Sequence, residues 1–241
     1  MTDFLFRDDA YRTDCPATIT AIDKRGFQTD ATVFYPLGGG QPGDIGQFTL
    51  ESGDVVEITD TVKGDGPDSI IHKPGSGSAA LKIGATGVLK LDWARRHRLM
   101  RMHTCLHLLS VLVPFPVTGG QVGDGKGRLD FDMADQIPDK DTLTAKLNEL
   151  IAADLAVTAR WITDEELLNS PDLVKTMAVK PPMGMGRVRL IEVAGQDRPL
   201  DLQACGGTHV ARTGEIGPVL VRKVENKGRQ NRRVNLEFAA Q

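Results

Sequence analysis

The stretch His103-Thr-Cys-Leu-His107 lies near the middle of this chain, and Cys205-Gly-Gly-Thr-His209 follows closer to its end. Each motif places two imidazole or thiolate groups four positions apart, a spacing that brings both onto one side of a helix or tight turn. Three imidazoles and one thiolate form a ligand set that suits Zn²⁺. We therefore predict one Zn²⁺ per chain, held by His103, His107, Cys205 and His209.

Histidine and cysteine are scarce in the rest of the chain. The chain has five histidines, three of them within the motifs, and three cysteines, two of them within the motifs. One His-x-x-x-His pair alone would equally suit two core or surface imidazoles, but the presence of both motifs favours a bound metal. Cys105 lies about 200° round a helix from His103 and His107. We expect it to be a buried structural thiol.

The segments around the motifs predict how the ligands are held. Residues 93–113 contain no Gly or Pro and carry an apolar stripe at helical spacing, so they predict a helix that ends at Pro114. The two histidines of the first motif would project from one face of this helix. Gly206-Gly207 predicts instead a tight turn that lets the backbone approach the site.

The composition excludes several classes of protein. The chain has 241 residues, 40% hydrophobic and 25% charged, with a net charge of −3. No apolar run approaches the length that spans a membrane, and residues 1–9 do not resemble a signal peptide. Three distant cysteines make no disulfide framework. We expect a cytoplasmic protein without membrane contact, and the sequence leaves its oligomeric state open.

The hydrophobic pattern changes near residue 92. Before it, β-branched segments alternate with Gly, Pro and Asp, and a loop is expected over 69–80; strands are predicted at 17–22, 31–35, 54–59 and 82–91. After it come a glycine-rich stretch at 119–127, a second helix at 139–157, and strands at 128–132, 188–193 and 219–224. We predict an α+β protein: a β-rich, barrel-like domain over 1–91, then an α+β domain with the metal site over 92–241.

Both ligand motifs resemble the two zinc motifs of the editing domain of alanyl-tRNA synthetases, most closely in its free-standing AlaX-type form. Residues 34–46, Phe-Tyr-Pro-Leu-Gly-Gly-Gly-Gln-Pro-Gly-Asp-Ile-Gly, resemble the glycine motif of that family's N-terminal domain. The resemblance continues at 126–131, 213–217 and 224–234, so it covers nearly the whole chain in the expected order. It implies a β-rich domain and a zinc-binding editing domain, without the core that carries out aminoacylation.

The activity implied by the resemblance is hydrolysis of the ester in mischarged Ser-tRNA(Ala), with Gly-tRNA(Ala) left open as a second substrate. Thr104 stands where His-Glu-x-x-His metalloproteases carry their glutamate, which argues against metalloprotease chemistry. We assign no general base and expect a zinc-bound water as nucleophile. Four protein ligands are typical of a structural zinc site, so the sequence leaves open whether zinc activates water or positions substrate. Asp201 and Glu215, which flank the second motif, are expected to be ordinary solvent-facing carboxylates.

The glycine motif has two interpretations. It is either a tight connection between strands or a segment that reaches the substrate through Gln41 and the backbone of Gly39 and Gly40. The resemblance favours the second, although Leu37 departs from the polar or small residue of the relatives. A site that hydrogen-bonds the serine hydroxyl would reject alanine strongly. The candidates for that contact are Thr104, Thr208 and Gln41.

Contact with the acceptor end of tRNA requires positive surface on an acidic chain. Arginines also cluster at 95–101, but the C-terminal segment contains only Glu225 as an acid between its basic residues. We predict that this segment contacts phosphates; its residues are Arg222, Lys223, Lys227, Arg229, Arg232 and Arg233. The ordinary alternative is a solvated charged face.

Two other functions remain open at this point. The chain could be a tRNA-binding module whose zinc is structural, or an editing hydrolase for another mischarged tRNA such as that of a threonyl-type system. The Cys-Gly-Gly-Thr-His form of the second motif and the Gly-Gly-Gln sequence favour the alanine branch.

Overall fold

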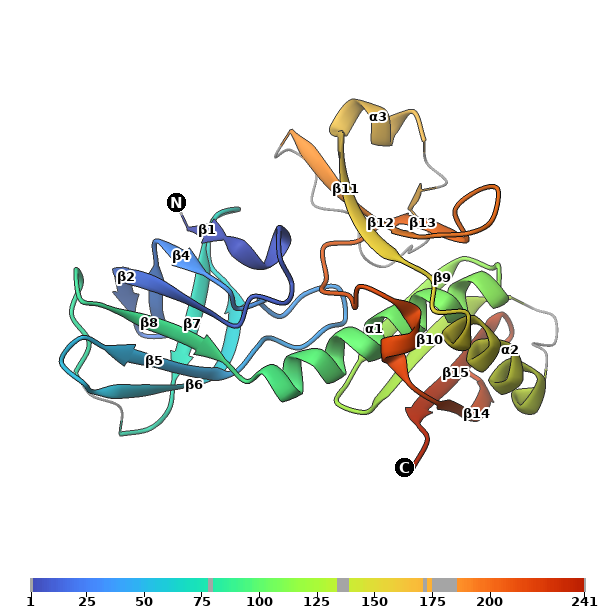
Figure 1. Ribbon diagram of the computed structural model, residues 1–241, viewed down its shortest axis with the longest axis horizontal. Helices are drawn as coiled ribbons and strands as arrows, with labels where there is room; N and C mark the ends of the chain where they lie inside the picture. Colours follow the sequence, from blue (N-terminus) through green and yellow to red (C-terminus); the bar gives the residue numbers. More distant parts are fainter. Residues whose placement is uncertain (1, 78–79, 134–138, 171–172, 175–185, 241) are drawn as a thin grey trace. The chain divides into compact units, whose positions relative to one another are not determined.

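The structure is a computed structural model and describes residues 2–77, 80–133, 139–170, 173–174 and 186–240. The chain divides into two compact units, Met1–His97 and Arg98–Gln241, each with its own strands (Figure 1). None of the helices within the described ranges is long and apolar enough to cross a membrane.

A closed six-stranded barrel forms the first unit, which confirms the predicted barrel-like domain. Alternating residues of its strands, such as Ile19, Phe48 and Leu89, fill the interior. Around the barrel, in order, run β2 (Asp14–Asp23), β3 (Gly26–Thr29), β7 (Ile70–Pro74), β6 (Val55–Lys63), β5 (Gly46–Leu50) and β8 (Thr86–Leu91). Outside it, β1 (Asp3–Phe4) pairs in parallel with β4 (Ala31–Thr32), and a 3₁₀ turn follows at Leu5–Arg7.

The prediction of a loop over 69–80 is wrong for Ile70–Pro74, which form β7 and pair with β6. Ile70, Ile71 and His72 are all buried, and Ile70 packs in a separate cluster with Phe4, Phe6 and Tyr35. The strand was missed because a histidine, a proline and the following glycine interrupt its short apolar run.

The second unit is α+β, as predicted. Helix α1 (Trp93–Leu112) begins in the first unit and continues into the second. One sheet has the order β14 (Val219–Asn226), β15 (Asn231–Phe238), β10 (Lys126–Asp132), β9 (Val117–Val122). The other has the order β11 (Val157–Thr163), β12 (Arg187–Val193), β13 (Asp201–Ala204). Smaller elements are α2 (Lys140–Ala152), α3 (Asp164–Leu168) and a 3₁₀ turn at Thr213–Ile216.

Several predicted segments differ in detail; of the strand predicted at 31–35, only Ala31–Thr32 form one. Helix α2 is capped by Asp139, whose side chain accepts hydrogen bonds from the next amides, but it ends at Ala152 rather than 157. Asp154 then adopts a φ of 48°, and Val157 already starts β11. The glycine-rich stretch at 119–127 spans β9 and the start of β10. A side chain at Gly127 would meet Met102 Sδ at 2.8 Å, so glycine there lets β10 approach α1 closely.

Helix α1 is the core of the second unit. Every residue from Met102 to Ser110 is buried, so apolar side chains point to all sides of this part of the helix. Four polar side chains lie within that buried stretch: His103, Thr104, His107 and Ser110. Buried polar groups need hydrogen-bond partners or a ligand, so these four residues mark the part of the helix where a functional site is expected.

Candidate metal centre

His103 and His107 lie one helical turn apart on α1, and both rings are buried. Their centroids are 5.3 Å apart. The spacing of four residues places them on the same side of the helix, as the sequence predicts. The surrounding helix is regular and tightly packed, so these two ligands are held on a rigid element.

Cys205 follows directly after β13, at the start of the loop that carries the second motif. The Cys205 amide donates to Arg189 O at 3.1 Å, and Arg189 Nη1 donates to Gly207 O at 2.7 Å. The buried Arg189 thus ties both ends of the Cys205–Gly207 turn to β12. The Gly207 amide in turn donates to Cys205 Sγ at 3.4 Å. Gly206 is exposed and Cys205 is partly exposed, so the thiolate is the most accessible of the four ligands.

The four predicted ligands come together. Cys205 Sγ lies 3.3 Å from His209 Nε2 and 3.6 Å from His103 Nε2. One ligand atom from each of His103, His107, Cys205 and His209 lies within 4.8 Å of all the others. Tetrahedral Zn²⁺ with ordinary bond lengths separates sulfur and nitrogen ligands by about 3.5 Å. Both the donor set and its spacing fit a zinc ion.

The electrostatics of the cluster favour the thiolate form of Cys205 and, in the absence of a metal, the protonated form of His107. Partial burial raises the pKa of the Cys205 thiol, but the neighbouring His103 and His209 outweigh this and hold that pKa well below its ordinary value. Burial lowers the pKa of His107, but hydrogen bonds to Asp201 and Cys205 outweigh it and raise that pKa to about 9. The thiolate is the form of cysteine that binds metal. Cys105, by contrast, is buried elsewhere and burial raises its pKa to about 12.

The interpretation of Asp201 as a solvent-facing carboxylate is wrong. Its side chain is buried, and His107 Nδ1 donates to Asp201 Oδ2 at 3.0 Å. Alternation along β13 turns Asp201 and Gln203 inward. The sequence did not reveal this because β13 is short and polar, so it was not predicted as a strand. Glu215 is half-buried and accepts hydrogen bonds from the Ala211 and Arg212 amides, so it shapes the turn after the second motif.

Thr104 and Thr208, two of the predicted substrate contacts, both lie at the cluster. Thr104 Oγ1 is 3.1 Å from His209 Nδ1 and accepts from the Val210 amide at 3.3 Å. Its hydroxyl therefore helps to orient the ring of His209, one of the predicted ligands. Thr208 is fully buried within the ligand loop. Their contact with substrate stays a prediction.

The glycine motif lies in the first unit and forms a tight turn. The Gly38 and Gln41 backbones exchange hydrogen bonds of 3.1 and 2.9 Å. Between them, Gly39 and Gly40 have φ values of 57° and 81°, which other residues rarely adopt. Locally, the glycine motif therefore has the geometry of a tight connection, the first of the two interpretations. The Gln41 side chain is buried, and the role of Gln41, Gly39 and Gly40 toward substrate stays a prediction.

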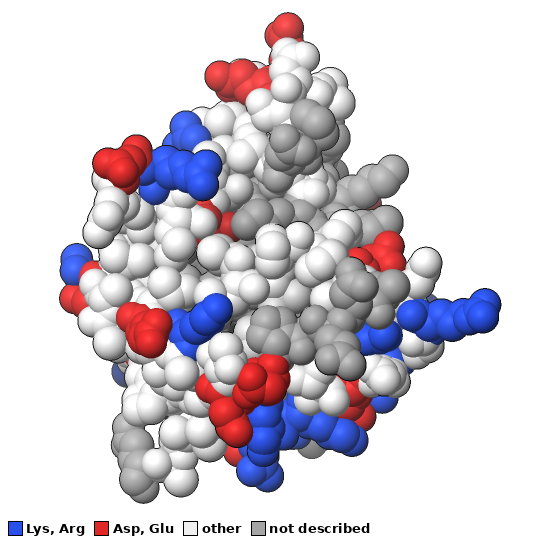
Figure 2. Space-filling model, turned by 90° about the vertical axis from the view of Figure 1, so that its right-hand side faces the viewer, with Lys and Arg blue, Asp and Glu red and all other residues white. Residues whose placement is uncertain are grey.

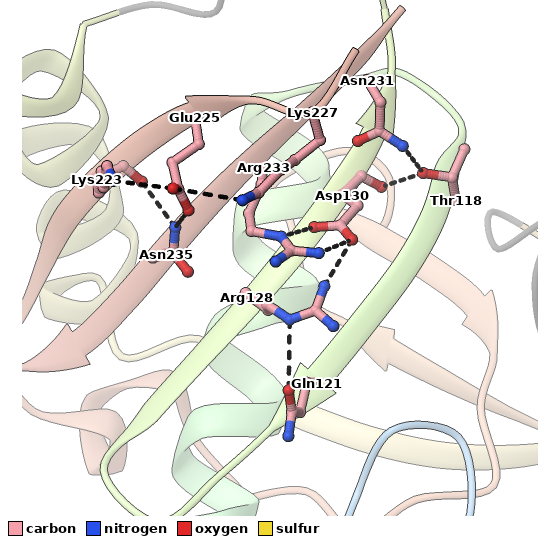
Figure 3. Close-up of polar contacts among 10 residues, drawn as sticks. All are labelled: Thr118, Gln121, Arg128, Asp130, Lys223, Glu225, Lys227, Asn231, Arg233 and Asn235. Atoms are coloured by element: carbon pink, nitrogen blue, oxygen red, sulfur yellow. Dashed lines mark hydrogen bonds and ion pairs between the residues drawn. The ribbon is translucent and has the colours of Figure 1, made fainter.

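The basic C-terminal segment forms part of β14, β15 and the turn between them, and most of its cations meet acids. Arg233 pairs with Asp130 of β10 at 2.7 Å, and Lys223 and Lys227 share Glu225 (Figure 3). Arg222 pairs with Glu237 at 3.1 Å. Arg232 Nη1 donates to Gly228 O, and Arg229 is exposed. Figure 2 likewise shows Lys and Arg interleaved with Asp and Glu on the face it presents. Phosphate binding by this segment stays a prediction.

A comparison with protein families relates part of the second unit to a domain of aminoacyl-tRNA synthetases. Residues 188–235 match the family described as the threonyl and alanyl tRNA synthetase second additional domain. This range includes β12, β13 and the second ligand motif. The second unit therefore carries a domain that also occurs in those synthetases.

Proteins that are similar over the whole chain show to which family within this class the chain belongs. Alanyl-tRNA editing protein AlaX-M of Saccharolobus solfataricus is 32% identical over 97% of this chain and 98% of its own length. AlaX-M of Methanosarcina acetivorans is 33% identical over the same shares. An alanine–tRNA ligase of Methanospirillum hungatei is 33% identical over 88% of this chain but only 22% of the ligase. The chain belongs to the AlaX-M family of alanyl-tRNA editing proteins.

Proposed function

We propose that this protein is a trans-editing hydrolase that deacylates mischarged Ser-tRNA(Ala) in a zinc-dependent reaction and has no aminoacylation activity. The observation that carries the proposal is the convergence of three imidazoles and a thiolate within 4.8 Å in a member of the AlaX-M family. The relatives' name supplies the class of substrate, and the cluster supplies a place for the chemistry.

The cluster would hold the ion through Cys205 Sγ and the three imidazoles. When bound, Zn²⁺ would supply a positive charge that polarises the ester carbonyl and stabilises the negative charge developing on its oxygen. The partly exposed thiolate and the exposed Gly206 mark the side from which an ester would approach. Asp201 accepts a hydrogen bond from His107 and so orients a ligand; we assign no general base.

Discrimination between serine and alanine requires a hydrogen bond to the serine hydroxyl. A site built for that hydroxyl disfavours alanine because its own polar group would lose its partner. Thr208 is fully buried beside His209, and Thr104 Oγ1 lies 3.1 Å from that ligand's ring. We propose these two hydroxyls, with Gln41 and the Gly39 and Gly40 amides of the glycine motif, as the substrate-binding groups. Gly-tRNA(Ala) is the smaller substrate to compare.

Binding of the tRNA acceptor end is proposed for the basic C-terminal segment. Arg229 is exposed and Arg232 Nη1 donates to Gly228 O, whereas the other four cations of the segment pair with acids. The paired cations would have to exchange carboxylates for phosphates, which lowers the net gain in binding free energy. Contacts of this kind recognise the backbone and weaken as salt concentration rises.

A second candidate is a tRNA-binding module with a structural zinc. The specific observation in its favour is the four-ligand set, since structural zinc sites are closed by four protein ligands and catalytic ones usually keep a position open. Both candidates predict zinc binding, so they differ only in hydrolysis.

The test is the release of amino acid from Ser-tRNA(Ala), Ala-tRNA(Ala) and Ser-tRNA(Thr) by zinc-loaded protein. Rapid release of serine from Ser-tRNA(Ala), with the alanyl ester spared, is the expected result. Hydrolysis of Ser-tRNA(Thr) alone would assign the protein to a threonyl-type system. If all three esters survive, the protein is not an editing hydrolase for these substrates, and the binding module takes its place.

A further inference from the structure

A closed circuit of hydrogen bonds connects α1 to β13 behind the ligand His107. His107 Nδ1 donates to Asp201 Oδ2 at 3.0 Å, and Gln203 Nε2 donates to the same oxygen at 2.7 Å. Gln203 Nε2 also donates to Ser110 Oγ at 3.3 Å. Ser110 Oγ returns to the helix by donating to His107 O at 2.7 Å. All four residues are buried.

The donors and acceptors of the circuit are consistent with one arrangement of protons. A carboxylate only accepts, so the His107 proton at this position must sit on Nδ1. The Gln203 amide uses its two N–H groups for Asp201 and Ser110, and the Ser110 hydroxyl uses its single proton for the helix carbonyl. With Nδ1 protonated, the lone pair of neutral His107 is on Nε2, the ring nitrogen left for a metal.

We infer that Asp201 is a positioning residue for the metal centre: it fixes the tautomer and ring orientation of His107 and, through Gln203 and Ser110, locks the two ligand motifs together. The inference rests on the proposed metal site. Asp201 and Gln203 lie on the strand that runs directly into Cys205, while His107 and Ser110 lie on the helix that carries the first motif. The circuit therefore joins the two segments whose separation determines whether four ligands meet.

The energetic reason for such a circuit is the low polarity of its surroundings. An unpaired imidazole N–H or carboxylate in a buried site costs more than the same group at the surface. The His107 N–H is paired with Asp201 only when Nδ1 faces that carboxylate, so ring rotamers that turn Nδ1 away are disfavoured. Carboxylate partners of this kind also increase the basicity of a ligating imidazole.

The test compares Asp201→Asn with Asp197→Asn, the same change at an exposed aspartate four residues away. Zinc affinity is measured by competition with a chromophoric chelator, and Co²⁺ is substituted to record its visible ligand-field bands. We expect Asp201→Asn to weaken zinc binding about 10- to 100-fold and to shift the Co²⁺ bands. Asp197→Asn should match the wild type in both.

A third readout separates positioning from a general loss of structure. In ¹⁵N NMR spectra of the zinc-loaded wild type, His107 should carry its proton on Nδ1. Ser110→Ala keeps Asp201 and removes only the far side of the circuit. It should leave this tautomer unchanged and weaken zinc binding less than Asp201→Asn does.

Unchanged zinc affinity and Co²⁺ bands in Asp201→Asn, with tight binding in the wild type, would overturn the inference alone. A wild-type protein that binds no zinc would overturn the metal-dependent function and this inference with it. If Asp201→Asn does not fold, two other measurements test the inference: the site of the His107 proton in the wild type and the zinc affinity of Ser110→Ala. A proton on Nδ1 and weakened zinc binding by Ser110→Ala would support the inference. Protonation of His107 on Nε2 would contradict it.

Discussion

Arg96 and Asp44 form a buried ion pair that fixes the glycine motif to the first turn of α1. Arg96 Nε lies 2.9 Å from Asp44 Oδ2, and Arg96 Nη2 contacts the same oxygen. The guanidinium also donates to Val33 O and Ala10 O, while Asp44 accepts from the Tyr35 amide at 2.6 Å. One arginine thus organises several chain segments of the first unit.

Replacing Arg96 by Met should destabilise the first unit severely. The change leaves the Asp44 carboxylate buried without its cation, a situation that costs about 3–5 kcal/mol. Urea unfolding followed by Trp93 fluorescence in a Trp161→Phe background measures this unit. The neighbour Arg95→Met is the matched control, because Arg95 is half-buried and its Nη1 donates to a backbone oxygen, that of Gly43, at 2.8 Å. Equal effects of the two changes would contradict the importance assigned to the buried pair.

His72 should make the first unit sensitive to acid. It is fully buried between Phe27 and Phe34, and burial lowers its pKa to about 4. Because the unfolded chain binds a proton near pH 6.5 and the folded one near pH 4, stability is full above pH 6.5. It falls as the pH drops from 6.5 toward 4, by up to about 3 kcal/mol.

The measurement for His72 is the unfolding free energy of wild type and His72→Gln at pH 7, 5.5 and 4.5. Other acid-sensitive groups are common to both proteins, so the difference between them isolates His72. The gap between the two should narrow toward low pH. A gap that stays constant would show that His72 does not titrate in this way.

Cys205→Ala should lower zinc content and serine release together, since it removes one of four ligands and the only thiolate of the cluster. Cys105→Ala is the control: that thiol is buried on the same helix as His103 and His107 but outside the cluster. It should retain zinc and lose about 1–2 kcal/mol of stability through the small cavity it creates. Metal analysis and the deacylation assay, carried out on the same samples, show whether zinc content and activity fall together. Full activity in a zinc-free Cys205→Ala protein would remove the central role of the metal.

Neutralising Arg232 and Arg233 together, each by Gln, should weaken tRNA binding and reduce its salt dependence while zinc content stays unchanged. Each lost phosphate contact lowers the slope of log affinity against log salt by about 1. Lys24→Gln, at an exposed position in the first unit, is the matched charge control. Because Arg233 is paired with Asp130, Arg233→Gln alone should weaken tRNA binding less than the double change does. An unaltered salt slope in the double variant would discard the basic segment as the tRNA contact.

The four residues of the candidate metal cluster were readable from sequence because their chemistry is rare and their spacing is local. His103 and His107 needed only a helix, and Cys205 and His209 only a turn. The β-rich, barrel-like character of the first unit followed in the same way from alternating short strands. In each case neighbouring residues carry the signal.

Features that depend on the pairing of distant segments were not readable. Asp201 looks like any acid before a glycine-rich turn, and only the packing of β13 against α1 shows it to be buried beside His107. Asp130 and Glu237 offset much of the basic segment's charge, and strand register brings Asp130 opposite Arg233. The β7 strand was hidden because a buried histidine reads as polar.

The most direct test of the account is removal and return of the metal. Purified protein is stripped with a chelator, and serine release from Ser-tRNA(Ala) is measured before stripping, after stripping and after addition of one equivalent of Zn²⁺, with circular dichroism recorded each time. The account predicts that activity is lost with the metal and restored by one equivalent while the fold is retained. Full hydrolysis by folded, zinc-free protein would contradict it.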